Sequence, residues 1–253
     1  MENLRVSTMT AISSLNSNIN LDNLYKNIQI NNDILFIEHG SHGIKGESHK
    51  IKRKTRKPEK KKTFFNQVTI HVNCDKIVNV KLFNNGKVQM TGLKYETHGS
   101  NVLDKLVPII KLLDVSNELK VLDHNEIVYT PMNIVLINSD FDIGFKVQRD
   151  SLHREIVDVG MYSSYEPCIY PGVNTKFFWN KSNVLQDGIC KCTKKCLGKG
   201  SGDGDGDCKK ITVSVFQSGN VIITGARNIE QINDAYNFIN NIFESNYQVL
   251  KKI

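Results

Sequence analysis

The chain contains no long hydrophobic run and no recognisable export signal. No stretch of about 18 consecutive apolar residues occurs, so the sequence predicts no membrane span and no membrane partner. Residues 1–15 are polar and lack the apolar centre of a signal peptide, which predicts an intracellular protein. In a reducing compartment the six cysteines are expected to be free thiols or metal ligands before they are disulfides.

The sequence also lacks a recognisable set of catalytic residues. The sequence has no nucleophile beside a base, and no paired carboxylates at a spacing typical of acid–base catalysis. We therefore expect no enzymatic activity, no small-molecule substrate and no cofactor that a reaction requires.

Positive charge exceeds negative charge. The 253 residues include 33 Lys and Arg against 26 Asp and Glu, a formal net charge of +7. This excess favours an anionic partner, either nucleic acid or an acidic membrane surface, although many globular proteins carry it without a specific partner. Hydrophobic residues make up 40% of the chain, so the length suffices for one large domain or two small ones with a core.

The most informative feature is an internal repeat. Residues 83–94 have the pattern F-x-x-G-x-V-x-x-T-G-x-K, and residues 216–227 have the pattern F-x-x-G-x-V-x-x-T-G-x-R. Because the match occurs twice, each time before a helical pattern, we interpret it as the duplication of one supersecondary unit.

Each copy predicts a β-hairpin followed by a helix. A β-rich run leads through a glycine-containing turn into a second strand. The runs are residues 77–83 and 87–91 in the first copy, and residues 211–216 and 220–224 in the second. Apolar residues then recur at helical spacing along residues 102–113 and 229–243. Pro108 lies inside the first helical pattern and is expected to kink or shorten that helix.

The strands offer apolar residues to both faces of the predicted sheet. Residues 221–223 are Val, Ile and Ile in succession, so one face can pack on the helix while the other needs further cover. Two interpretations stay open at this point: a second layer of protein, or an apolar binding surface.

Two segments have the composition of loops inserted into the repeats. Residues 42–62 include a basic stretch at residues 50–62 and are expected to form a flexible loop. The basic stretch would strengthen DNA binding through counterion release or act as an import signal; the alternative is a solvated surface loop. Residues 180–209 are rich in Cys, Lys and Gly and are expected to form a loop stapled by its cysteines.

Four cysteines of the second loop have a spacing that suits a metal ion. They form C-x-C-x3-C-x11-C and are Cys190, Cys192, Cys196 and Cys208. Four thiolates in a short loop can surround Zn²⁺ tetrahedrally, which predicts a structural zinc. The spacing differs from the paired C-x-x-C form, so a loop of reduced, unliganded cysteines is the alternative. Residues 202–207 alternate Gly and Asp but lack the features of a calcium loop, which we exclude.

Several motifs resemble those of the TATA-box-binding protein family. Residues 161–172, MYSSYEPCIYPG, are similar to the family's F-S-S-Y-E-P-E-L-F-P-G, and residues 216–227 are similar to its F-x-S-G-K-x-x-x-T-G-A-K. Residues 131–135, PMNIV, resemble the Q-N-I-V that opens the family's second repeat, and residues 6–9, VSTM, resemble V-S-T-V in the first. The resemblance covers most of the chain outside the two insertions and is more specific in the second repeat.

The resemblance implies an α+β fold. It is a saddle of two pseudo-symmetric repeats, in which one curved antiparallel sheet carries helices on its convex face. Residues 1–118 would form the first repeat with the basic insertion at 42–62, and residues 119–253 the second with the Cys/Gly-rich insertion at 180–209. The insertions are typical of a divergent member, for which a large DNA virus is one source. The location would be the nucleus, or a cytoplasmic viral factory or virion.

The resemblance also implies a general transcription initiation factor that binds and bends A/T-rich promoter DNA through the minor groove. Aromatic side chains would enter between base steps and kink the duplex. TA steps unstack easily, and an apolar sheet would reject the amino group of G·C pairs. The implied partners are double-stranded promoter DNA, a transcription factor IIB-like protein and the RNA polymerase machinery.

Individual positions receive roles from the resemblance. The aromatic wedges would be Phe65 and Phe83 in the first repeat, and Tyr170 and Phe216 in the second. The residues that touch the groove would be Asn133, Thr91 and Thr224, over an apolar floor of Val6, Val135 and Ile222. The phosphates would be neutralised by Lys87, Lys94, Lys176 and Arg227. The factor IIB-like protein would contact Glu166 and Ile169.

Some positions depart from the family pattern. Lys81 and Gln89 stand where the family has apolar groove-facing residues, His71 replaces an Arg, and Cys168 replaces an acidic residue near Glu166. These departures favour an alternative: a saddle-fold module for protein interaction or nonspecific DNA binding that has lost strict TATA recognition. Another alternative is an accessory domain of an enzyme, since the same fold occurs in nucleic-acid repair and RNA-degrading enzymes.

Overall fold

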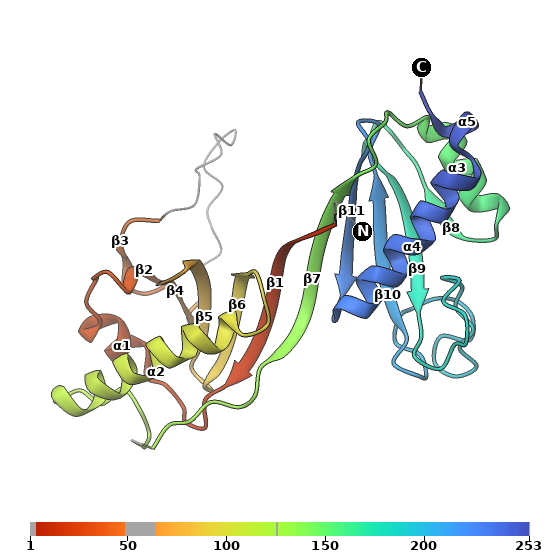
Figure 1. Cartoon of the computed structure of the whole chain (residues 1–253). Coiled ribbons are helices and arrows are strands. Elements are labelled where there is room, and N and C mark those ends of the chain that lie inside the picture. The colour runs from red at the N-terminus through yellow and green to blue at the C-terminus, as the bar shows by residue number, and fades with distance from the viewer. Residues whose placement is uncertain (1–3, 49–63, 125, 253) are drawn as a thin grey trace. The chain divides into compact units, whose positions relative to one another are not determined.

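The structure of the chain is a computed structural model that describes residues 4–48, 64–124 and 126–252. The basic stretch at residues 50–62 lies outside the described residues. Contacts within the chain divide it into two compact units. The N-terminal unit is Met9–Ile134, and the C-terminal unit is Met1–Thr8 together with Val135–Ile253. In each unit, helices cover one face of an antiparallel sheet, which is an α+β arrangement (Figure 1).

The N-terminal unit pairs its strands in the order β3-β2-β4-β5-β6-β1. These are β1 (Arg5–Ser14), β2 (Ile34–His39), β3 (Gly43–Gly46), β4 (Gln67–Cys74), β5 (Lys76–Phe83) and β6 (Lys87–Leu93). Helix α1 (Leu21–Asn27) packs on β2 and β4, and helix α2 (His98–Ser116) packs on β4 and β6. Alternate residues of β5, namely Val78, Val80 and Leu82, are buried, as expected of a sheet covered on one face.

The C-terminal unit pairs its strands in the order β7-β11-β10-β9-β8. These are β7 (Asn133–Asp142), β8 (Tyr162–Ser164), β9 (Val173–Trp179), β10 (Lys209–Val215) and β11 (Asn220–Ala226). Helix α3 (Arg149–Asp158) packs on β8 and β9, and helix α4 (Ile229–Ser245) packs on β9, β10 and β11. The short helix α5 (Tyr247–Leu250) follows α4 and contacts it.

Helix α4 confirms the helical pattern of the second repeat. The side chain of Asn228 accepts a hydrogen bond from the backbone N–H of Gln231 at 2.9 Å, which caps the first turn. The apolar stripe, including Ile232, Ala235 and Ile239, is buried and faces the sheet. The spacing of apolar residues therefore identified the helix and its buried face.

The two copies of the repeat form the same backbone turn. Gly86 and Gly219 have positive φ values of 77° and 99°, and each donates its backbone N–H to the carbonyl of the motif's Phe at 3.0 Å. A Cβ at Gly86 would lie 2.3 Å from the carbonyl oxygen of Ser17, and one at Gly219 would lie 2.4 Å from that of Phe145. Both turns therefore require glycine, and the repeat in sequence is a repeat in structure.

Helix α2 is longer than predicted. The sequence predicts that Pro108 kinks or shortens it, but the helix continues through Pro108 to Ser116. Leu106 and Ile110, on either side of the proline, are buried, so packing of this face offsets the hydrogen bond that proline cannot donate. In the described part of the chain, no helix is both long and apolar enough to cross a membrane.

The first predicted loop begins with a strand. Residues 43–46, expected to be part of a flexible loop, form β3 and pair with β2 from Phe36↔Gly46 to His39↔Gly43. The expectation of a loop was therefore wrong for these residues. The strand begins and ends with glycine. Because glycine is depleted in strands, the sequence pattern did not predict a strand here.

The contact-based division falls after Ile134, whereas the repeat alignment divides the chain after residue 118. Residues between these limits pack on the N-terminal unit. The carboxylate of Asp114 accepts hydrogen bonds from the backbone N–H groups of Val121 at 2.7 Å and Leu122 at 2.9 Å. Val121 and Leu122 are also buried. A linking segment of this kind has no counterpart in the repeat, so motif matching does not assign it.

Candidate nucleic-acid interface

The face of the N-terminal sheet that lies opposite the helices is largely polar. Strand register places four residues in one row across it: Thr69, Lys81, Gln89 and Ile12. The next row holds His71, Asn79, Thr91 and Thr10. The predicted groove contact Thr91 therefore shares this face with Lys81, Gln89 and His71, three of the departures from the family pattern.

His71 is turned into the sheet and does not extend from it. The side chain is buried, and its ring stacks on that of Phe36 with 4.5 Å between ring centroids. The side-chain amide of Asn79 donates to its Nε2 at 3.1 Å. His71 is thus held within the sheet layer and does not substitute for a long cationic side chain that reaches a phosphate.

A hollow of about 410 Å³ lies at the predicted groove-contacting positions of this unit. Phe83, Lys87, Gln89 and Asn133 are among the residues that line it. Lys87 and Asn133 are exposed, and Phe83 is half-buried. The structure therefore brings one predicted wedge, one predicted phosphate contact and the predicted base-reading Asn around one concavity. Lys94 is exposed just beyond β6.

Phe65 extends from the segment that precedes β4. Its side chain is 65% exposed, and that of the neighbouring Phe64 is 60% exposed. The pairing of Gln67 with Phe83 puts Phe65 and Phe83 at the same end of the β4–β5 hairpin. The two predicted wedges of the first repeat therefore lie at one end of the sheet.

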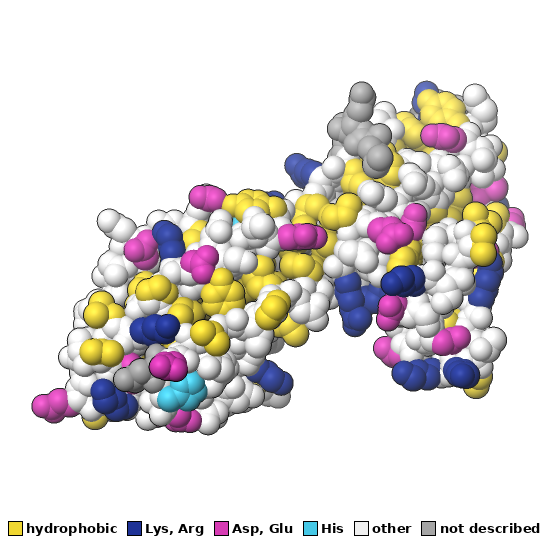
Figure 2. All heavy atoms as spheres, turned by 60° about the horizontal axis from the view of Figure 1, so that its bottom comes forward, with side chains coloured by type: hydrophobic (Ala, Val, Ile, Leu, Met, Phe, Trp, Pro, Cys, Tyr) yellow, Lys and Arg dark blue, Asp and Glu magenta, His cyan; other side chains and the backbone are white. Residues whose placement is uncertain are grey.

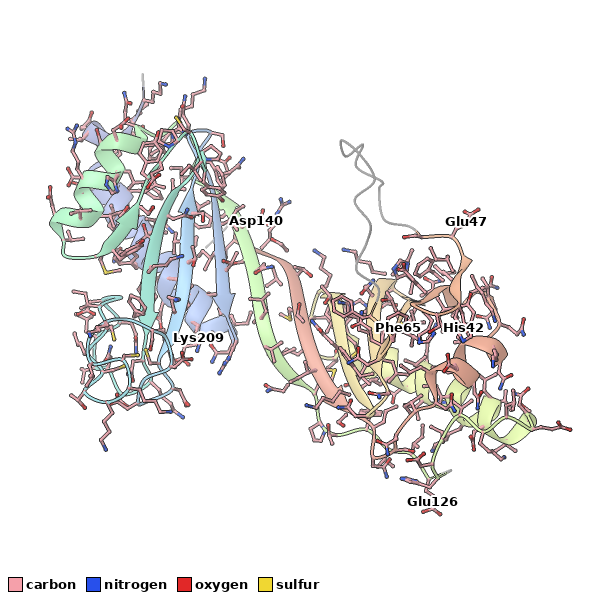
Figure 3. The ribbon with its side chains drawn as sticks, turned by 180° about the vertical axis from the view of Figure 1, so that it is seen from behind. His42, Glu47, Phe65, Glu126, Asp140 and Lys209 are labelled. Carbon is pink, nitrogen blue, oxygen red and sulfur yellow. The ribbon has the colours of Figure 1, made fainter. Side chains whose placement is uncertain are left out.

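A histidine network supports the backbone at Phe65 (Figure 3). Nε2 of the buried His39 lies 3.3 Å from the carbonyl oxygen of Phe65. The opposite nitrogen of His39 faces the carboxylate of Asp22 at 3.7 Å, and the same carboxylate lies 2.6 Å from Nε2 of His42. The carboxylate thereby places negative charge beside both imidazole rings, one of which contacts the Phe65 backbone. The sequence gives no motif for this network, because its members come from separate elements.

Tyr170 and Phe216 form an edge-to-face pair in the C-terminal unit. Their ring centroids are 5.7 Å apart and their planes meet at 61°, a favourable geometry for aromatic rings. Tyr170 is 38% exposed, and Phe216 is half-buried. A Cβ at Gly172 would lie 2.8 Å from the Tyr170 ring and 3.3 Å from the Phe216 ring. The glycine therefore allows both predicted wedges of the second repeat to approach one backbone segment.

Arg149 joins the two chain segments that carry these rings. Its guanidinium donates to the backbone carbonyl of Pro171, and to Oε1 of Gln217 at 3.0 Å. These are the residues directly after Tyr170 and Phe216. The partners lie 22 and 68 positions away in sequence, so no local motif pointed to Arg149.

Polar residues also occupy the outer face of the C-terminal sheet. One row across the strands holds Lys176, Thr212, Thr224 and Asn138, and the next holds Asn174, Ser214, Ile222 and Asp140. Nζ of Lys176 donates to Oγ1 of Thr212 at 2.8 Å. Val6 and Val135 are half-buried in this unit. The expected apolar floor is therefore interrupted, since Ile222 lies between Ser214 and Asp140.

Asp140 places a carboxylate on this face (Figure 3). The carboxylate accepts a hydrogen bond from Nε of Arg5 at 2.6 Å and another from the hydroxyl of Ser7. The side chain of Arg5 is 79% exposed and that of Asp140 is 25% exposed. Water screens an ion pair in this setting, so the carboxylate contributes negative potential to the surface beside Ile222.

Four cations of β9, β10 and the end of β11 interact as two pairs: Lys176 with Lys210, and Lys209 with Arg227. Burial lowers the pKa of Lys176, and the charge of Lys210 lowers it further. Burial also lowers the pKa of Lys209; Arg227 acts in the same direction and Asp203 opposes it. These mutual effects mark two basic pairs able to contact phosphates. Successive side chains of a strand point to opposite faces, so Lys209 and Lys210 belong to different faces of the sheet. Lys209 and Lys210 escaped the sequence-based prediction because they border the Cys/Gly-rich insertion.

Glu166 and Ile169 lie on a tight turn before the aromatic pair. The backbone N–H groups of Ile169 and Tyr170 both donate to the carbonyl of Glu166 at 2.9 Å. Ile169 is 81% exposed, and Glu166 is exposed as well. The turn therefore presents one acidic and one aliphatic side chain to solvent.

The four loop cysteines come together as their spacing predicts. The Sγ atoms of Cys190, Cys192, Cys196 and Cys208 all lie within 4.8 Å of one another. The hydroxyl of Ser201, together with nearby backbone N–H groups, lowers the pKa of Cys196 to about 6. Burial raises the pKa of Cys192 and of Cys208. A set of four sulfur ligands is therefore assembled in the loop.

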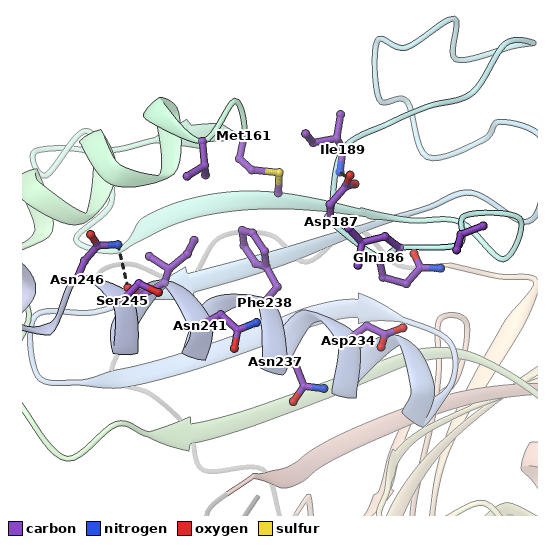
Figure 4. Close-up of a pocket in the computed structure, with 14 residues that line it drawn as sticks. Met161, Gln186, Asp187, Ile189, Asp234, Asn237, Phe238, Asn241, Ser245 and Asn246 are labelled. Carbon is purple, nitrogen blue, oxygen red and sulfur yellow. Dashed lines mark hydrogen bonds between the residues drawn. The ribbon is translucent and has the colours of Figure 1, made fainter.

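A groove of about 670 Å³ lies beside α4 (Figure 4). Asn237, Phe238 and Asn241 of the helix line it, together with residues 184–187 of the Cys/Gly-rich loop. Its two carboxylates have partners: Nε1 of Trp179 donates to Asp234 at 2.7 Å, and Lys191 pairs with Asp187 at 2.5 Å. This groove therefore offers no paired carboxylates for acid–base catalysis.

Comparison with known proteins points to one family. The family model described as transcription factor TFIID (or TATA-binding protein, TBP) matches residues 131–246. A TATA-box-binding protein-like protein of Acanthamoeba polyphaga mimivirus is 31% identical over 264 residues, which cover 98% of this chain and 67% of that protein. The solved structure of Methanococcus jannaschii TBP matches with a TM-score of 0.55 at 18% identity, over 96% of this chain and 99% of that one. This match confirms the fold implied by the motifs.

Proposed function

The chain belongs to the TATA-box-binding protein family, and from this premise we propose that it binds and bends A/T-rich promoter DNA through the minor groove to initiate transcription. Family membership by itself indicates a DNA-binding, transcription-related role. The observation that best supports bending of the minor groove is the Tyr170–Phe216 pair. Its rings contact each other edge to face, and Tyr170 is partly exposed.

The aromatic residues supply the energy that a kink requires. Unstacking a base step costs a few kcal/mol, and minor-groove proteins offset it by inserting apolar wedges and wrapping more surface. Stacking a base on an aromatic ring contributes about 1–3 kcal/mol. Tyr170 and Phe216 would enter one step, and Phe65 and Phe83 another. TA steps deform most easily, which favours A/T-rich sites.

The basic residues supply sequence-independent affinity. Each phosphate that a protein neutralises adds about 0.9 to the slope of log affinity against log salt, through counterion release. In the C-terminal unit this role falls to the two basic pairs, Lys176 with Lys210 and Lys209 with Arg227. In the N-terminal unit it falls to Lys87 and Lys94, both exposed.

The polar rows change how bases would be read. In the minor groove every base pair offers acceptors, and G·C adds one amino donor. Asn133, Thr91 and Thr224 can donate to the acceptors. The amide oxygen of Gln89 can accept from the guanine amino group, whereas an apolar floor would reject it. We therefore infer weaker discrimination against G·C pairs than the motifs alone imply.

A second candidate function follows from the same polar rows and from the Asp140 carboxylate. A face with these groups also suits nonspecific DNA binding, or a protein partner in place of DNA. Minor-groove binding of the first kind needs a continuous apolar surface against the groove. Here that surface is interrupted, because the polar residues Ser214 and Asp140 flank Ile222.

End-to-end energy transfer on a labelled TATA duplex, titrated with protein, separates the two candidates. A G·C-only duplex of the same length is the control. A large bend that favours the A/T duplex is expected for the promoter-binding function. Equal binding to both duplexes without a bend would favour nonspecific binding, and no binding to either would favour a protein partner.

Removing the Asp140 carboxylate is expected to strengthen DNA binding. Asp140→Val takes away negative charge and a polar group and extends the apolar surface of Ile222. We expect a gain in affinity of about 10-fold, or about 1.4 kcal/mol, for the A/T duplex in a fluorescence anisotropy titration. Glu244→Val makes the same change in charge at an exposed position of α4 and is the matched control. Unchanged or weaker binding by Asp140→Val would show that this face does not meet DNA.

Arg149 is expected to act as a positioning residue for the aromatic pair. Arg149→Met keeps the length of the side chain but loses the hydrogen bonds to Pro171 and Gln217, worth about 1 kcal/mol each. We expect the A/T duplex to be bent less and bound about 5- to 10-fold more weakly. Arg149→Lys should restore little of this, because an ammonium cannot bridge two acceptors in the fork geometry of a guanidinium. Full recovery by Lys would indicate that Arg149 contributes only charge.

The exposed turn at Glu166 and Ile169 is the proposed contact for a transcription factor IIB-like protein that recruits the polymerase machinery. Glu166→Arg reverses the charge of the turn and leaves the backbone carbonyl that accepts both hydrogen bonds in place. In a gel-shift assay, the variant is expected to form the complex with DNA but not the ternary complex with the IIB-like protein. A ternary complex of undiminished affinity would assign that contact elsewhere.

A further inference from the structure

The loop that joins β9 to β10 lacks an ordinary core. Residues 180–208 contain no helix or strand. Its aliphatic side chains Val184, Leu185 and Leu197 are exposed. The side chains that cluster inside it are those of Cys190, Cys192, Cys196 and Cys208. A long loop without secondary structure or apolar packing needs another source of order.

The backbone of this loop adopts conformations that require support. Lys195, Leu197 and Asp207 have positive φ values of 52°, 48° and 56°, and in the described ranges no other non-glycine residue has one. A left-handed backbone costs about 1–2 kcal/mol per such residue, so surrounding structure must hold it. Lys195 and Leu197 flank Cys196, and Asp207 directly precedes Cys208, which places the strained positions beside the sulfur cluster.

The chain also passes unusually close to the sulfurs. A Cβ at Gly204 would lie 2.3 Å from Sγ of Cys192 and 2.8 Å from Sγ of Cys196. Gly204 has no positive φ, so its need for glycine comes from this approach and not from backbone strain. The fold of the loop is therefore organised around the sulfur atoms.

Polar groups contact the sulfurs from the surrounding loop. The hydroxyl of Ser201 lies 2.8 Å from Sγ of Cys196. The side-chain amide of Asn180 donates to Sγ of Cys192 at 3.5 Å and to the carbonyl of Asp205 at 2.7 Å. Hydrogen bonds of this kind orient metal ligands and stabilise the thiolate form.

We propose that Cys190, Cys192, Cys196 and Cys208 bind one structural Zn²⁺ ion. Tetrahedral coordination with Zn–S bonds of about 2.3 Å places the sulfurs about 3.8 Å apart. The sulfurs lie within 4.8 Å of one another, so small side-chain rotations suffice to reach this distance. Four sulfur ligands select zinc or iron, and sulfurs this close surround a single ion and leave no room for an iron–sulfur cluster.

The charge of the loop complements such a centre. Four thiolates outweigh the charge of one Zn²⁺ and leave a net negative charge. Exposed lysines alternate with the ligands: Lys191, Lys194, Lys195 and Lys199. Lys and Arg side chains are visible at the lower end of the C-terminal unit in the space-filling view (Figure 2). The lysines offset the negative charge of the centre, and the zinc in turn holds them on one compact loop.

Metal analysis of the full-length protein, purified without chelator, tests the site. We expect about one equivalent of zinc bound through these thiolates, which Cys196→Ser removes. Cys168→Ser is the matched control, since Cys168 is an exposed cysteine outside the cluster, and it should retain the ion. Gly204→Ala should weaken zinc binding, because its Cβ would collide with two ligand sulfurs. Zinc below about a tenth of an equivalent in the wild-type protein, or iron in its place, would overturn the proposal.

Alkylation of the wild-type protein gives a second readout that does not depend on whether variants fold. Under native conditions Cys168 should react while the four loop cysteines stay protected, and a chelator should expose those four. Loop cysteines that react fully without chelator would overturn the proposal. Neither readout involves DNA, so the result is independent of the proposed function.

Discussion

The Phe83→Ala/Phe216→Ala double variant is expected to bind an A/T duplex about 100-fold more weakly than the wild-type protein, a loss of about 2.7 kcal/mol, and to leave the duplex unbent. The two residues hold matching positions in the repeat and lie at the start of identical turns. Each would supply one ring to a kinked step. Without them the remaining contacts cannot offset the unstacking of two base steps.

This experiment needs variants that distinguish the loss of ring insertion into DNA from a loss of protein stability. Phe83 and Phe216 are half-buried, so circular dichroism must establish that the double variant is folded. Phe65→Ala/Tyr170→Ala removes the more exposed member of each proposed pair and should abolish the bend with less effect on stability. Phe64→Ala is the matched control, because Phe64 is as exposed as Phe65 but has no wedge role. Undiminished bending by both double variants would remove the wedge mechanism.

Alanine at either turn glycine of the repeat is expected to destabilise the protein by about 3 kcal/mol or more. Positive φ costs a non-glycine residue about 1 kcal/mol. The added Cβ must also displace a backbone carbonyl, that of Ser17 for Gly86 and that of Phe145 for Gly219, and overpacking of this kind costs about 1–3 kcal/mol more. Denaturant unfolding followed by circular dichroism measures both variants.

Each unit also contains a control glycine, at which alanine would incur the cost of a positive φ without a steric clash. Gly43 and Gly144 have φ values of 88° and 81°, and a Cβ at either would meet nothing within 4 Å. Gly43→Ala and Gly144→Ala should therefore cost only about 1 kcal/mol. If the variants at Gly86 and Gly219 were no less stable than these controls, the close approach to the carbonyls would not contribute to stability.

The elements that the sequence predicted well are those with local patterns. The two hairpins follow from β-rich runs separated by a glycine turn, and α4 follows from apolar residues at helical spacing. The gathering of the four cysteines follows from their closeness in sequence, because a loop of this length can bring its own residues together. In each case the interacting groups are near neighbours along the chain.

The features that escaped prediction depend on contacts between distant segments. Arg149 acts on residues 22 and 68 positions away, and Asp140 joins the outer face only through the register of β7 with β11. Register also decides that Ser214 lies beside Ile222. A shift of one residue would send these side chains to the opposite face, so composition alone cannot reveal how polar a face is. Pro108 does not end α2 for a related reason, since tertiary packing outweighs its local cost.

The first residues of β1 belong with the last half of the chain. Residues up to Thr8 are part of the C-terminal unit, where Arg5 and Ser7 bond Asp140 from 135 and 133 positions away. During synthesis these residues leave the ribosome well before Asp140, whereas Met9–Ile134 can close on its own contacts. The C-terminal unit is therefore completed by a segment whose partner strand, β7, is made more than a hundred residues later. A fragment that begins at Val135 would leave the Asp140 carboxylate without its two donors, so cutting the gene after Ile134 does not yield two self-sufficient halves.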